Sequence, residues 1–399
     1  EMLQGDWSSD VCSSDLYERR DAYDSLSVPV YNTLAYEFDN AAVMAEAFTD
    51  KIKAPDYSRV ENPTVTNLER RVAALTDAAH ATAFNSGMAA ISNTLMALAA
   101  QGKKIVTSKH LFGNTYALLV ATLRRFGVKV RLRDLTNIEA VREAIDDDTC
   151  CVFLEILTNP QLEVADLKAI SEVAHEKNVP LVVDSTVIPF TQFSAKSLGV
   201  DIEVVSSSKY VSGGATSLGG LVIDYGTPYN GDFAKRLYGE MLFNFGAYMT
   251  PQVAYMQTIG LETLDARYRV QSSNALELAK KLRSLPQIKY VNYVGLEDNP
   301  YHELAQRQFG KTAGAMICID LESKEACFSF LNNLKLIHRA TNLFDNRSLA
   351  IHPASTIFGA FSENMRKSMD VKDTTIRLSV GLEDVDDLFE DIKQAVDSL

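Results

Sequence analysis

The chain has 399 residues, which at roughly 150 residues per domain suffices for two or three domains with a substantial apolar core. Its 46% hydrophobic and 23% charged residues exclude collagen-like, low-complexity and intrinsically disordered proteins. The 39 basic and 52 acidic side chains give a net charge of −13, which disfavours binding to nucleic acid or to an anionic membrane surface. We therefore expect neither of these partners.

The cysteines and histidines show no metal-binding pattern. Cys12, Cys150, Cys151, Cys318 and Cys327 follow no repeated spacing, so neither a disulfide framework nor a zinc site is predicted. Unpaired cysteines favour a reducing compartment such as the cytoplasm. No apolar run reaches the 18 or so residues required to cross a bilayer. We expect a soluble, cytoplasmic protein that holds no metal.

The N-terminal 61 residues differ from the rest of the chain in composition and in hydrophobic periodicity. Residues 1–16 are rich in Ser and Asp, hold the only Trp and have no periodicity. They resemble translated sequencing-adapter sequence, and we exclude them from the fold as a non-native or disordered leader; a genuine unstructured terminus is the alternative. Residues 17–61 carry turn signals and one short helical stretch at 41–48. They are expected to form an N-terminal arm.

Residues 62–250 alternate short apolar runs with helical segments. Asn62 and Pro63 are typical of a helix start, and a second helix follows the turn at Asn85, Ser86 and Gly87. Alternating strands and helices predict a mostly parallel sheet with helices on both faces. Strands are expected at 103–108, 128–132, 150–156, 179–184 and 201–208, and helices between them at 116–126, 138–145 and 164–177.

Residues 251–399 have a different pattern. A long helix is expected at 252–285, a strand at 315–321 and a final helix at 385–399. This segment predicts a smaller α+β domain. The chain as a whole is therefore assigned to the α/β class.

Charged residues stand at the ends of two expected strands. Asp184 ends an almost wholly apolar strand, and Lys209 follows the strand at 201–208. Ligands bind at the carboxyl ends of strands in open α/β sheets. A buried carboxylate requires a cationic partner, and a desolvated lysine is reactive toward a carbonyl carbon. A helix cap at Asp184 and a solvated lysine at 209 are the alternative readings.

Two further segments suit an anion. Ser86, Gly87 and Met88 open a helix, where free backbone N–H groups and the helix dipole attract negative charge. Tyr57 and Arg59 come just before the helix at Pro63, and the guanidinium suits a phosphate. A plain loop-to-helix turn and a surface arginine are the alternatives.

These segments together describe one ligand, a phosphorylated aromatic aldehyde with a cationic ring. Pyridoxal 5′-phosphate has each of these features. Its aldehyde would form a Schiff base with Lys209, and its ring nitrogen would stay protonated opposite Asp184. Its phosphate would be held by the backbone of Gly87 and Met88 and by the hydroxyls of Ser206 and Ser208.

Seven segments resemble, in order and spacing, the Cys/Met-metabolism family of pyridoxal-phosphate enzymes. They are YSRVENPTVTNLE, FNSGMAAI, HLFGNTY, VVDSTVIPF, VVSSSKYVSGG, HPAST and IRLSVGLED, and the resemblance covers about residues 25–399. Within the family, HLFGNTY, DSTVIPF and ATNLFDNRSLAIHPASTIF look most like O-acetylhomoserine sulfhydrylases.

The resemblance implies fold type I, with the cofactor in the large domain at 62–250 and a C-terminal domain at 251–399. It implies that Lys209 is the Schiff-base lysine, that Asp184 is the pyridinium partner and that Thr186 lies under the ring. It also implies that Tyr57 and Arg59 reach the phosphate of a neighbouring subunit. The catalytic unit would then be a dimer, commonly paired into a homotetramer.

Three positions depart from the usual family pattern. Phe112 replaces the Tyr that most members stack on the cofactor ring, so stacking survives but a hydroxyl is lost, and Tyr57 is the candidate for its proton-transfer role. Asn114 replaces the Cys typical of methionine γ-lyases, which disfavours a purely degradative lyase. Asn342 stands near the substrate carboxylate where several members have Ser, and it can still donate a hydrogen bond. Arg377 would bind that carboxylate.

We expect γ-replacement on O-acetyl-L-homoserine, with sulfide or a small thiol, to give homocysteine or a methionine-type product. Cystathionine γ-synthase and cystathionine or methionine γ-lyase are the alternatives within the family. An alternative of another class is a non-catalytic oligomeric nucleotide-binding protein that uses the SGGATSLGG stretch. This stretch follows a lysine and does not fit G-x-G-x-x-G, which weakens that alternative.

Overall fold

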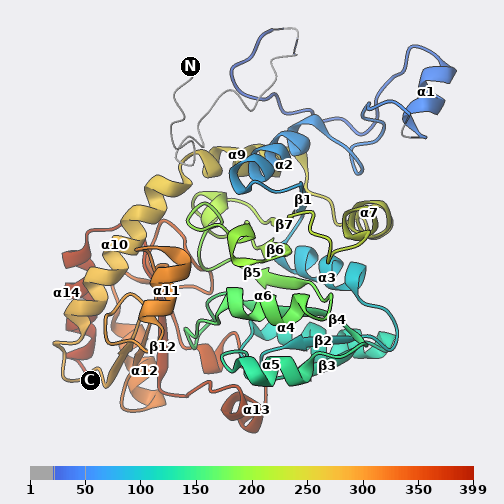
Figure 1. Ribbon diagram of the computed structural model, residues 1–399. Helices are drawn as coiled ribbons and strands as arrows, with labels where there is room; N and C mark the ends of the chain where they lie inside the picture. Colours follow the sequence, from blue (N-terminus) through green and yellow to red (C-terminus); the bar gives the residue numbers. More distant parts are fainter. Residues whose placement is uncertain (1–20, 22, 50) are drawn as a thin grey trace, which may run out of the picture.

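The computed structural model describes residues 21, 23–49 and 51–399. The expected leader at 1–16 lies outside these residues. Figure 1 shows a central sheet flanked by helices, a second region formed by the C-terminal part of the chain, and a helix near the N-terminus, α1, that stands away from both. The two sheets fall within the proposed domains at 62–250 and 251–399, respectively.

A seven-stranded sheet forms the centre, in the order β1-β7-β6-β5-β4-β2-β3. Strands β2 to β6 pair in parallel, while β7 runs antiparallel to both β1 and β6. The expected mostly parallel sheet is thus confirmed, and β1 and β7 are additions to it. The strands are β1 (His80–Phe84), β2 (Lys104–Thr107), β3 (Lys129–Leu132), β4 (Thr149–Glu155), β5 (Leu181–Asp184), β6 (Ile202–Val205) and β7 (Gly220–Asp224).

A five-stranded, mainly antiparallel sheet in the order β10-β11-β12-β9-β8 forms the core of the C-terminal region. Helices α10 and α12 pack against it, and α14 packs against both of these helices, so this region is the smaller α+β unit that was expected. Its strands are β8 (Tyr290–Asn292), β9 (Met316–Asp320), β10 (His338–Arg339), β11 (Leu349–Ile351) and β12 (Thr375–Ser379).

Helices connect the strands throughout. Among the described residues, none of them combines the length and the apolar character that crossing a bilayer requires. They are α1 (Ala41–Ala47), α2 (Pro63–Thr76), α3 (Gly87–Leu98), α4 (Gly113–Ala117), α5 (Ile138–Ala144), α6 (Leu167–His175), α7 (Phe233–Arg236), α8 (Phe243–Phe245), α9 (Pro251–Glu262), α10 (Leu264–Leu282), α11 (His302–Phe309), α12 (Lys324–Asn333), α13 (Glu363–Ser368) and α14 (Val385–Val396).

Two expected helices differ in detail. The helix expected at 252–285 is two helices, α9 and α10, which meet at Thr263. The helix expected at 116–126 begins as α4 and continues as a π-helical turn, Leu118–Thr122, and a 3₁₀ turn, Leu123–Phe126. The helix start at Asn62 and Pro63 is confirmed, because the Asn62 side chain accepts a hydrogen bond from the Thr64 N–H.

The large sheet is apolar on both faces, since successive side chains of a strand point to opposite sides. In β5, Leu181 and Val183 pack in one hydrophobic cluster with residues of α6, while Val182 packs in another with residues of α3. Asp184 continues the face of Val182. Glu155 pairs with Asp184 in the parallel register of β4 and β5. Both carboxyl groups therefore lie on the side of the sheet that α3 covers.

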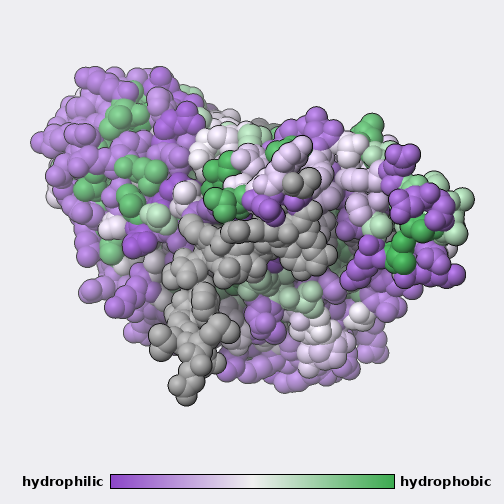
Figure 2. All heavy atoms as spheres, turned by 90° about the horizontal axis from the view of Figure 1, so that it is seen from above, coloured by the Kyte–Doolittle hydropathy of each residue, from purple (hydrophilic) through white to green (hydrophobic). Residues whose placement is uncertain are grey.

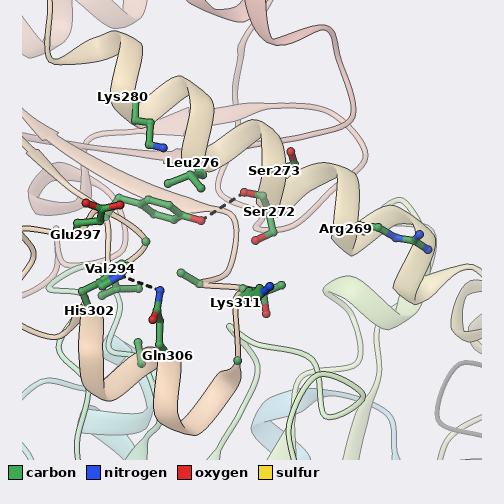
Figure 3. Close-up of a pocket in the computed structure, with 16 residues that line it drawn as sticks. Arg269, Ser272, Ser273, Leu276, Lys280, Val294, Glu297, His302, Gln306 and Lys311 are labelled. Carbon is green, nitrogen blue, oxygen red and sulfur yellow. Dashed lines mark hydrogen bonds between the residues drawn. The ribbon is translucent and has the colours of Figure 1, made fainter. Parts of the chain in front are cut away.

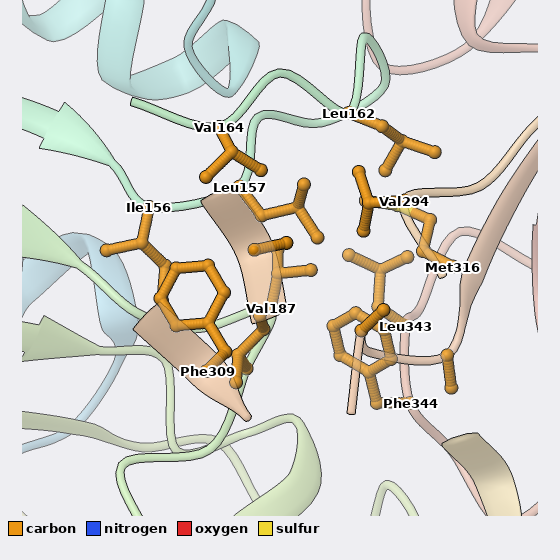
Figure 4. Close-up of a cluster of buried hydrophobic side chains, with 14 of the residues drawn as sticks. Ile156, Leu157, Leu162, Val164, Val187, Val294, Phe309, Met316, Leu343 and Phe344 are labelled. Atoms are coloured by element: carbon orange, nitrogen blue, oxygen red, sulfur yellow. The ribbon is translucent and has the colours of Figure 1, made fainter. Parts of the chain in front are cut away.

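Apolar side chains join the two sheets next to the strand ends. Figure 4 shows Ile156 and Leu157, which follow β4, beside Val187, which follows β5, and Phe309 at the end of α11. Phe344 belongs to the same cluster and stacks on Tyr210, with 4.1 Å between the ring centroids. The smaller sheet is thereby held against the end of the large sheet where charged residues gather.

The N-terminal arm exposes large apolar side chains. Leu34, Met44, Phe48 and Tyr57 are all exposed. Figure 2 shows apolar spheres at the projecting end of the molecule, where α1 lies, amid a mostly hydrophilic surface. Exposed apolar groups on a projecting segment are typical of a protein interface. The expected contact of the arm with a second subunit stays a prediction.

Replacing Phe309 by Ala should destabilise the fold strongly. The Phe309 ring is 1% exposed and contacts Phe193 edge-on at 5.3 Å between centroids. Removing a buried ring leaves a cavity, and we expect a loss of about 3–5 kcal/mol in the free energy of unfolding, measured by urea denaturation. The Phe126 ring is 63% exposed, so Phe126→Ala is the control and should change stability by less than about 0.5 kcal/mol. Equal losses in the two variants would contradict the proposed packing.

Candidate active site

A cavity of about 580 Å³ opens at the carboxyl ends of β4 and β5. Strand ends, α3 and loops of the large-sheet region line one part of it, and residues of the C-terminal region line the other. Most of the residues predicted from the sequence lie together here, although they are far apart in the chain. These are Ser86, Gly87, Met88, Phe112, Asp184, Thr186, Ser206, Ser208, Lys209, Asn342 and Arg377.

Lys209 follows β6 and is one of the residues that line the cavity. Nζ donates a hydrogen bond to Oδ1 of Asn342 at 2.9 Å. Burial lowers the pKa of Lys209 to about 8; the charge of Arg377 adds to this effect and that of Asp184 opposes it. An appreciable fraction of the amine is therefore unprotonated near neutral pH and can act as a nucleophile or a base.

Asp184 ends β5 and is buried. Its Oδ1 accepts a hydrogen bond from the Thr186 N–H at 2.9 Å. Burial raises the pKa of Asp184, while the hydrogen bonds from Thr186 and the charge of Lys209 act in the opposite direction. The Thr186 hydroxyl in turn accepts a hydrogen bond from the Ser206 N–H at 2.8 Å and so links the ends of β5 and β6. A buried carboxylate in this position suits a cationic ligand.

Arg377 projects from β12 and is 2% exposed. Its Nη1 donates to Oδ1 of Asn159 at 3.2 Å, and its Nη2 donates to the main-chain oxygen of Asn342 at 3.3 Å and to that of Thr341 at the same distance. Its Nε has no hydrogen-bond partner within the described part of the chain. Burial lowers the pKa of Arg377 to about 10, so it stays cationic at neutral pH and can bind a carboxylate.

The start of α3 forms the anion-binding end of the cavity. The Ser86 hydroxyl caps the helix by accepting from the Ala89 N–H at 3.1 Å. The preceding N–H groups, of Gly87 and Met88, lie before the first bond of the helix. A Cβ atom at Gly87 would lie 2.6 Å from Cβ of Ser206. Glycine therefore allows the helix start to reach the end of β6.

The two serines predicted to hold a phosphate differ in their bonding. The Ser206 hydroxyl makes no hydrogen bond with another described residue and lines the cavity. The Ser208 hydroxyl donates to the Gly219 carbonyl at 3.1 Å and accepts from the Gly219 N–H at 2.9 Å. Ser206 can donate to a phosphate as it stands, whereas Ser208 would have to turn its proton away from Gly219.

Phe112 forms an aromatic part of the wall at the start of α4. Its N–H donates to Oε1 of Glu155, a residue that sequence analysis missed. Glu155 ends β4, as Asp184 ends β5, so the same strand-end rule applies to it. Asn159 and Thr341 were also missed, and so were Ile91, Val187, Leu218, Leu343, Thr356 and Ile357, which complete the lining.

Tyr57 and Arg59 do not line this cavity. Tyr57 is 41% exposed, and the Arg59 guanidinium lies 5.5 Å from the centre of its ring. Nη1 of Arg59 donates to the Phe243 carbonyl. Both side chains are on the surface of the single chain, away from the residues with which they were grouped.

A second cavity, of about 330 Å³, lies between α10 and α11. Figure 3 shows Arg269 at one end of it, Lys280 towards the other and Lys311 between them, so its positive charges are spread along it. None of the residues predicted for the site lines it. The candidate active site is therefore the cavity at the strand ends.

The strand-end cavity fits pyridoxal phosphate. It offers a buried acid for the ring nitrogen at Asp184, an amine at Lys209, and a helix start with a free hydroxyl for the phosphate. The missing Cβ of Gly87 lets the helix start lie directly beside Ser206, so the free N–H groups of Gly87 and Met88 and the Ser206 hydroxyl can donate to the same phosphate. Its volume lies within the roughly 300–1,000 Å³ typical of small-molecule sites.

Replacing Lys209 by Met should change the pH dependence of stability in the cofactor-free protein. The folded pKa of about 8 lies below the ordinary 10.5, so between these values the folded state binds fewer protons than the unfolded state. The free energy of unfolding of the wild type should therefore rise with pH through this window, and Lys209→Met should abolish the rise. At pH 7 the variant should be more stable than the wild type by about 1–3 kcal/mol. Unfolding midpoints from pH 7 to 10 test this. Lys168→Met, at an exposed position of α6, is the control, and identical pH curves for both variants would refute the assignment.

Known proteins resemble this chain over most of its length. A family model described as Cys/Met metabolism PLP-dependent enzyme matches residues 13–397. An L-methionine gamma-lyase of Fusobacterium nucleatum subsp. polymorphum is 37% identical over 384 residues, covering 95% of each chain. A Campylobacter jejuni structure described as an O-acetylhomoserine (thiol)-lyase, which contains a pyridoxyl-lysine, is 34% identical with a TM-score of 0.93 and covers 98% of this chain and 99% of that one. The O-acetylhomoserine sulfhydrylase of Wolinella succinogenes is 44% identical with a TM-score of 0.76, covering 84% of this chain and 96% of that one. The chain therefore belongs to the Cys/Met metabolism family of pyridoxal-phosphate-dependent enzymes and has their type I fold.

Proposed function

We propose that the protein catalyses γ-replacement on O-acetyl-L-homoserine, with sulfide or a small thiol as the acceptor. The observation that carries the proposal is a cavity lined by Lys209, whose amine has a lowered pKa, together with the buried acid Asp184 and the buried guanidinium of Arg377. This arrangement supports proton transfer on an amino acid. The 44% identity to the Wolinella succinogenes sulfhydrylase supports the choice of substrate.

Each residue has a distinct role in this reaction. Arg377 binds the α-carboxylate of the substrate, and Asn342 holds the Lys209 amine near Cα. Bound pyridoxal phosphate withdraws electrons from Cα and so acidifies the protons on Cα and Cβ. The Lys209 amine removes the Cα proton, releases it and then removes the Cβ proton, which allows acetate to leave from Cγ. Asp184 stays ionised and stabilises the positive charge on the pyridine ring. The thiol then bonds to Cγ and loses its proton, and Lys209 returns protons to Cβ and Cα.

The neighbouring subunit completes the phosphate site in this proposal. Tyr57 and Arg59 lie on the surface of the single chain, and the arm that precedes them exposes apolar groups such as Met44 and Phe48. A second copy packed against the arm would receive both side chains at its own cavity. We therefore propose a dimer with shared sites, paired into a tetramer, in which Tyr57 also assists proton transfer.

A γ-lyase reaction is the second candidate. The 37% identity to the Fusobacterium L-methionine gamma-lyase over nearly the whole chain favours it. Asn114, where those lyases typically have Cys, argues for replacement instead. The two reactions share the steps up to the departure of the γ-substituent, and they differ in whether a thiol or a proton is added afterwards.

We also propose that the enzyme works in the cytoplasm. Cys150, Cys151, Cys318 and Cys327 are all free thiols in the structure. Free thiols persist in a reducing compartment, where sulfide and thiol products also stay reduced.

Purified holoenzyme incubated with O-acetyl-L-homoserine and sulfide should produce homocysteine and acetate in equal amounts. Lys209→Ala should lower the rate by at least about 10³-fold, since the variant lacks the base. Product analysis by mass spectrometry decides between the two candidates. Formation of 2-oxobutanoate and ammonia at the expense of homocysteine, with sulfide present, would overturn γ-replacement in favour of γ-elimination.

Mixing two inactive variants tests the shared site. Arg59→Ala should weaken phosphate binding in the neighbouring cavity, and Lys209→Ala should inactivate its own. The two variants are mixed in equal amounts, unfolded and refolded together. About half of the dimers are then hybrids, and each hybrid has one intact cavity out of two, so about a quarter of the wild-type activity should return. Mixtures with no activity above that of the separate variants would exclude the shared site. A Lys209→Ala sample refolded alone is the control.

A further inference from the structure

A single carboxyl group touches both the aromatic wall and the carboxylate-binding end of the active site. We propose that Glu155 is a positioning residue that holds Phe112, and Arg377 through Asn159, in fixed relation to each other. The cofactor ring and the substrate carboxylate would then be aligned by one side chain. The inference uses only the cofactor and amino-acid chemistry of the family, and it does not rest on the choice of γ-reaction.

Glu155 is built into the sheet and not into a loop. It is the last residue of β4, is 6% exposed and lies beside Asp184 in the parallel register. Its carboxyl group lines the cavity together with that of Asp184. A residue at the end of a buried strand has little freedom, so the groups bonded to it are fixed with respect to the sheet.

Both oxygens of the carboxyl group are used. Oε1 accepts a hydrogen bond from the Phe112 N–H, and Oε2 accepts one from the Asn159 N–H at 3.3 Å. Phe112 precedes α4, and Asn159 lies in the loop after β4. Glu155 therefore connects two separate segments of the cavity lining through their main chains, which no apolar residue could do.

The second contact continues to the substrate end of the cavity. Oδ1 of Asn159 accepts from Nη1 of Arg377 at 3.2 Å, and the other hydrogen bonds of this guanidinium within the described chain go to main-chain oxygens. Asn159 is thus the side chain that fixes the tilt of the guanidinium plane. A shift of Asn159 would therefore reorient the Arg377 guanidinium, whose N–H groups are the donors for a substrate carboxylate.

Burial of Glu155 is costly, which argues that it is retained for a purpose. Burial, and to a smaller extent the neighbouring charge of Asp184, raise the pKa of Glu155 to about 8. An acid placed beside another acid destabilises the fold unless its hydrogen bonds compensate. Two main-chain donors are the compensation that the structure shows.

The variants Glu155→Gln and Glu155→Ala separate positioning from stability. Glutamine has the same size but a single acceptor oxygen, so one of the two N–H groups would face an NH₂ group. Alanine removes both acceptors. Glu69→Gln is the matched control. Glu69 is another carboxyl whose pKa burial raises to about 8, and its Oε1 accepts the Ala83 N–H at 2.7 Å, but it does not line the cavity.

One affinity is measured for the holoenzyme and one for the apoenzyme of each variant. The first is the affinity for L-norleucine, an amino acid with no leaving group, from the change in the visible absorption of the holoenzyme. The second is the affinity of the apoenzyme for pyridoxal phosphate, by fluorescence titration. Thermal unfolding of all variants is recorded alongside.

Glu155→Gln should weaken at least one of the two affinities roughly five- to fifty-fold relative to Glu69→Gln, as expected for one buried donor left unpaired, and Glu155→Ala should weaken both. Losses below about threefold for both probes in Glu155→Gln would overturn the proposal, whatever the change in thermal stability. Wild-type protein that binds L-norleucine but forms no homocysteine would refute the proposed reaction and leave this inference standing.

Discussion

The active site depends on ionisable groups that are buried together but not paired with one another. Lys209, Arg377, Asp184 and Glu155 all line one cavity, and among the described residues none of them forms an ion pair with another. Each is held by neutral hydrogen-bond partners instead, such as Asn342 for the amine. Burial shifts the pKa of every one of them toward the neutral form. A ligand with a cationic ring and a carboxylate supplies the missing counter-charges, so binding relieves a cost that the empty fold carries.

The large sheet brings these charges to one place. Parallel strands end at the same edge, so Glu155 on β4, Asp184 on β5 and Lys209 after β6 are neighbours in space although the chain separates them by 20 residues or more. The smaller sheet adds Arg377 from its own strand, β12. Apolar contacts between the two regions, among them the stack of Tyr210 on Phe344, hold Arg377 in a fixed position relative to the strand ends of the large sheet.

Much of the fold and of the site follows from local pattern. Asp184 and Lys209 were predicted because they break apolar strands at their ends, and the start of α3 because a small-residue turn precedes a helix. Glu155 obeys the same strand-end rule, but the expected strand at 150–156 continues through Ile156, so the acid appeared to lie inside it.

Two elements of the fold were missed for local reasons. β1, with the sequence HATAF, has small residues and no apolar run, so it was not predicted as a strand. The junction between α9 and α10 at Thr263 has neither Gly nor Pro beside it, so the periodicity alone predicted one helix. Tyr57 and Arg59 lie outside the cavity of the single chain, and their proposed role depends on a contact between chains, which no pattern within one chain can define.

The contact between Gly87 and Ser206 has a consequence for how sequences of this kind can vary. The backbone of α3 meets the end of β6 so closely that even a methyl group at position 87 would collide with the Ser206 side chain. A side chain at position 87 is therefore sterically excluded, whatever its effect on anion binding. The Ser208 hydroxyl is not constrained in this way, because rotation of one bond would exchange its main-chain partner Gly219 for a ligand. Substitution at position 208 would therefore change the retention of the cofactor while the helix start keeps its place.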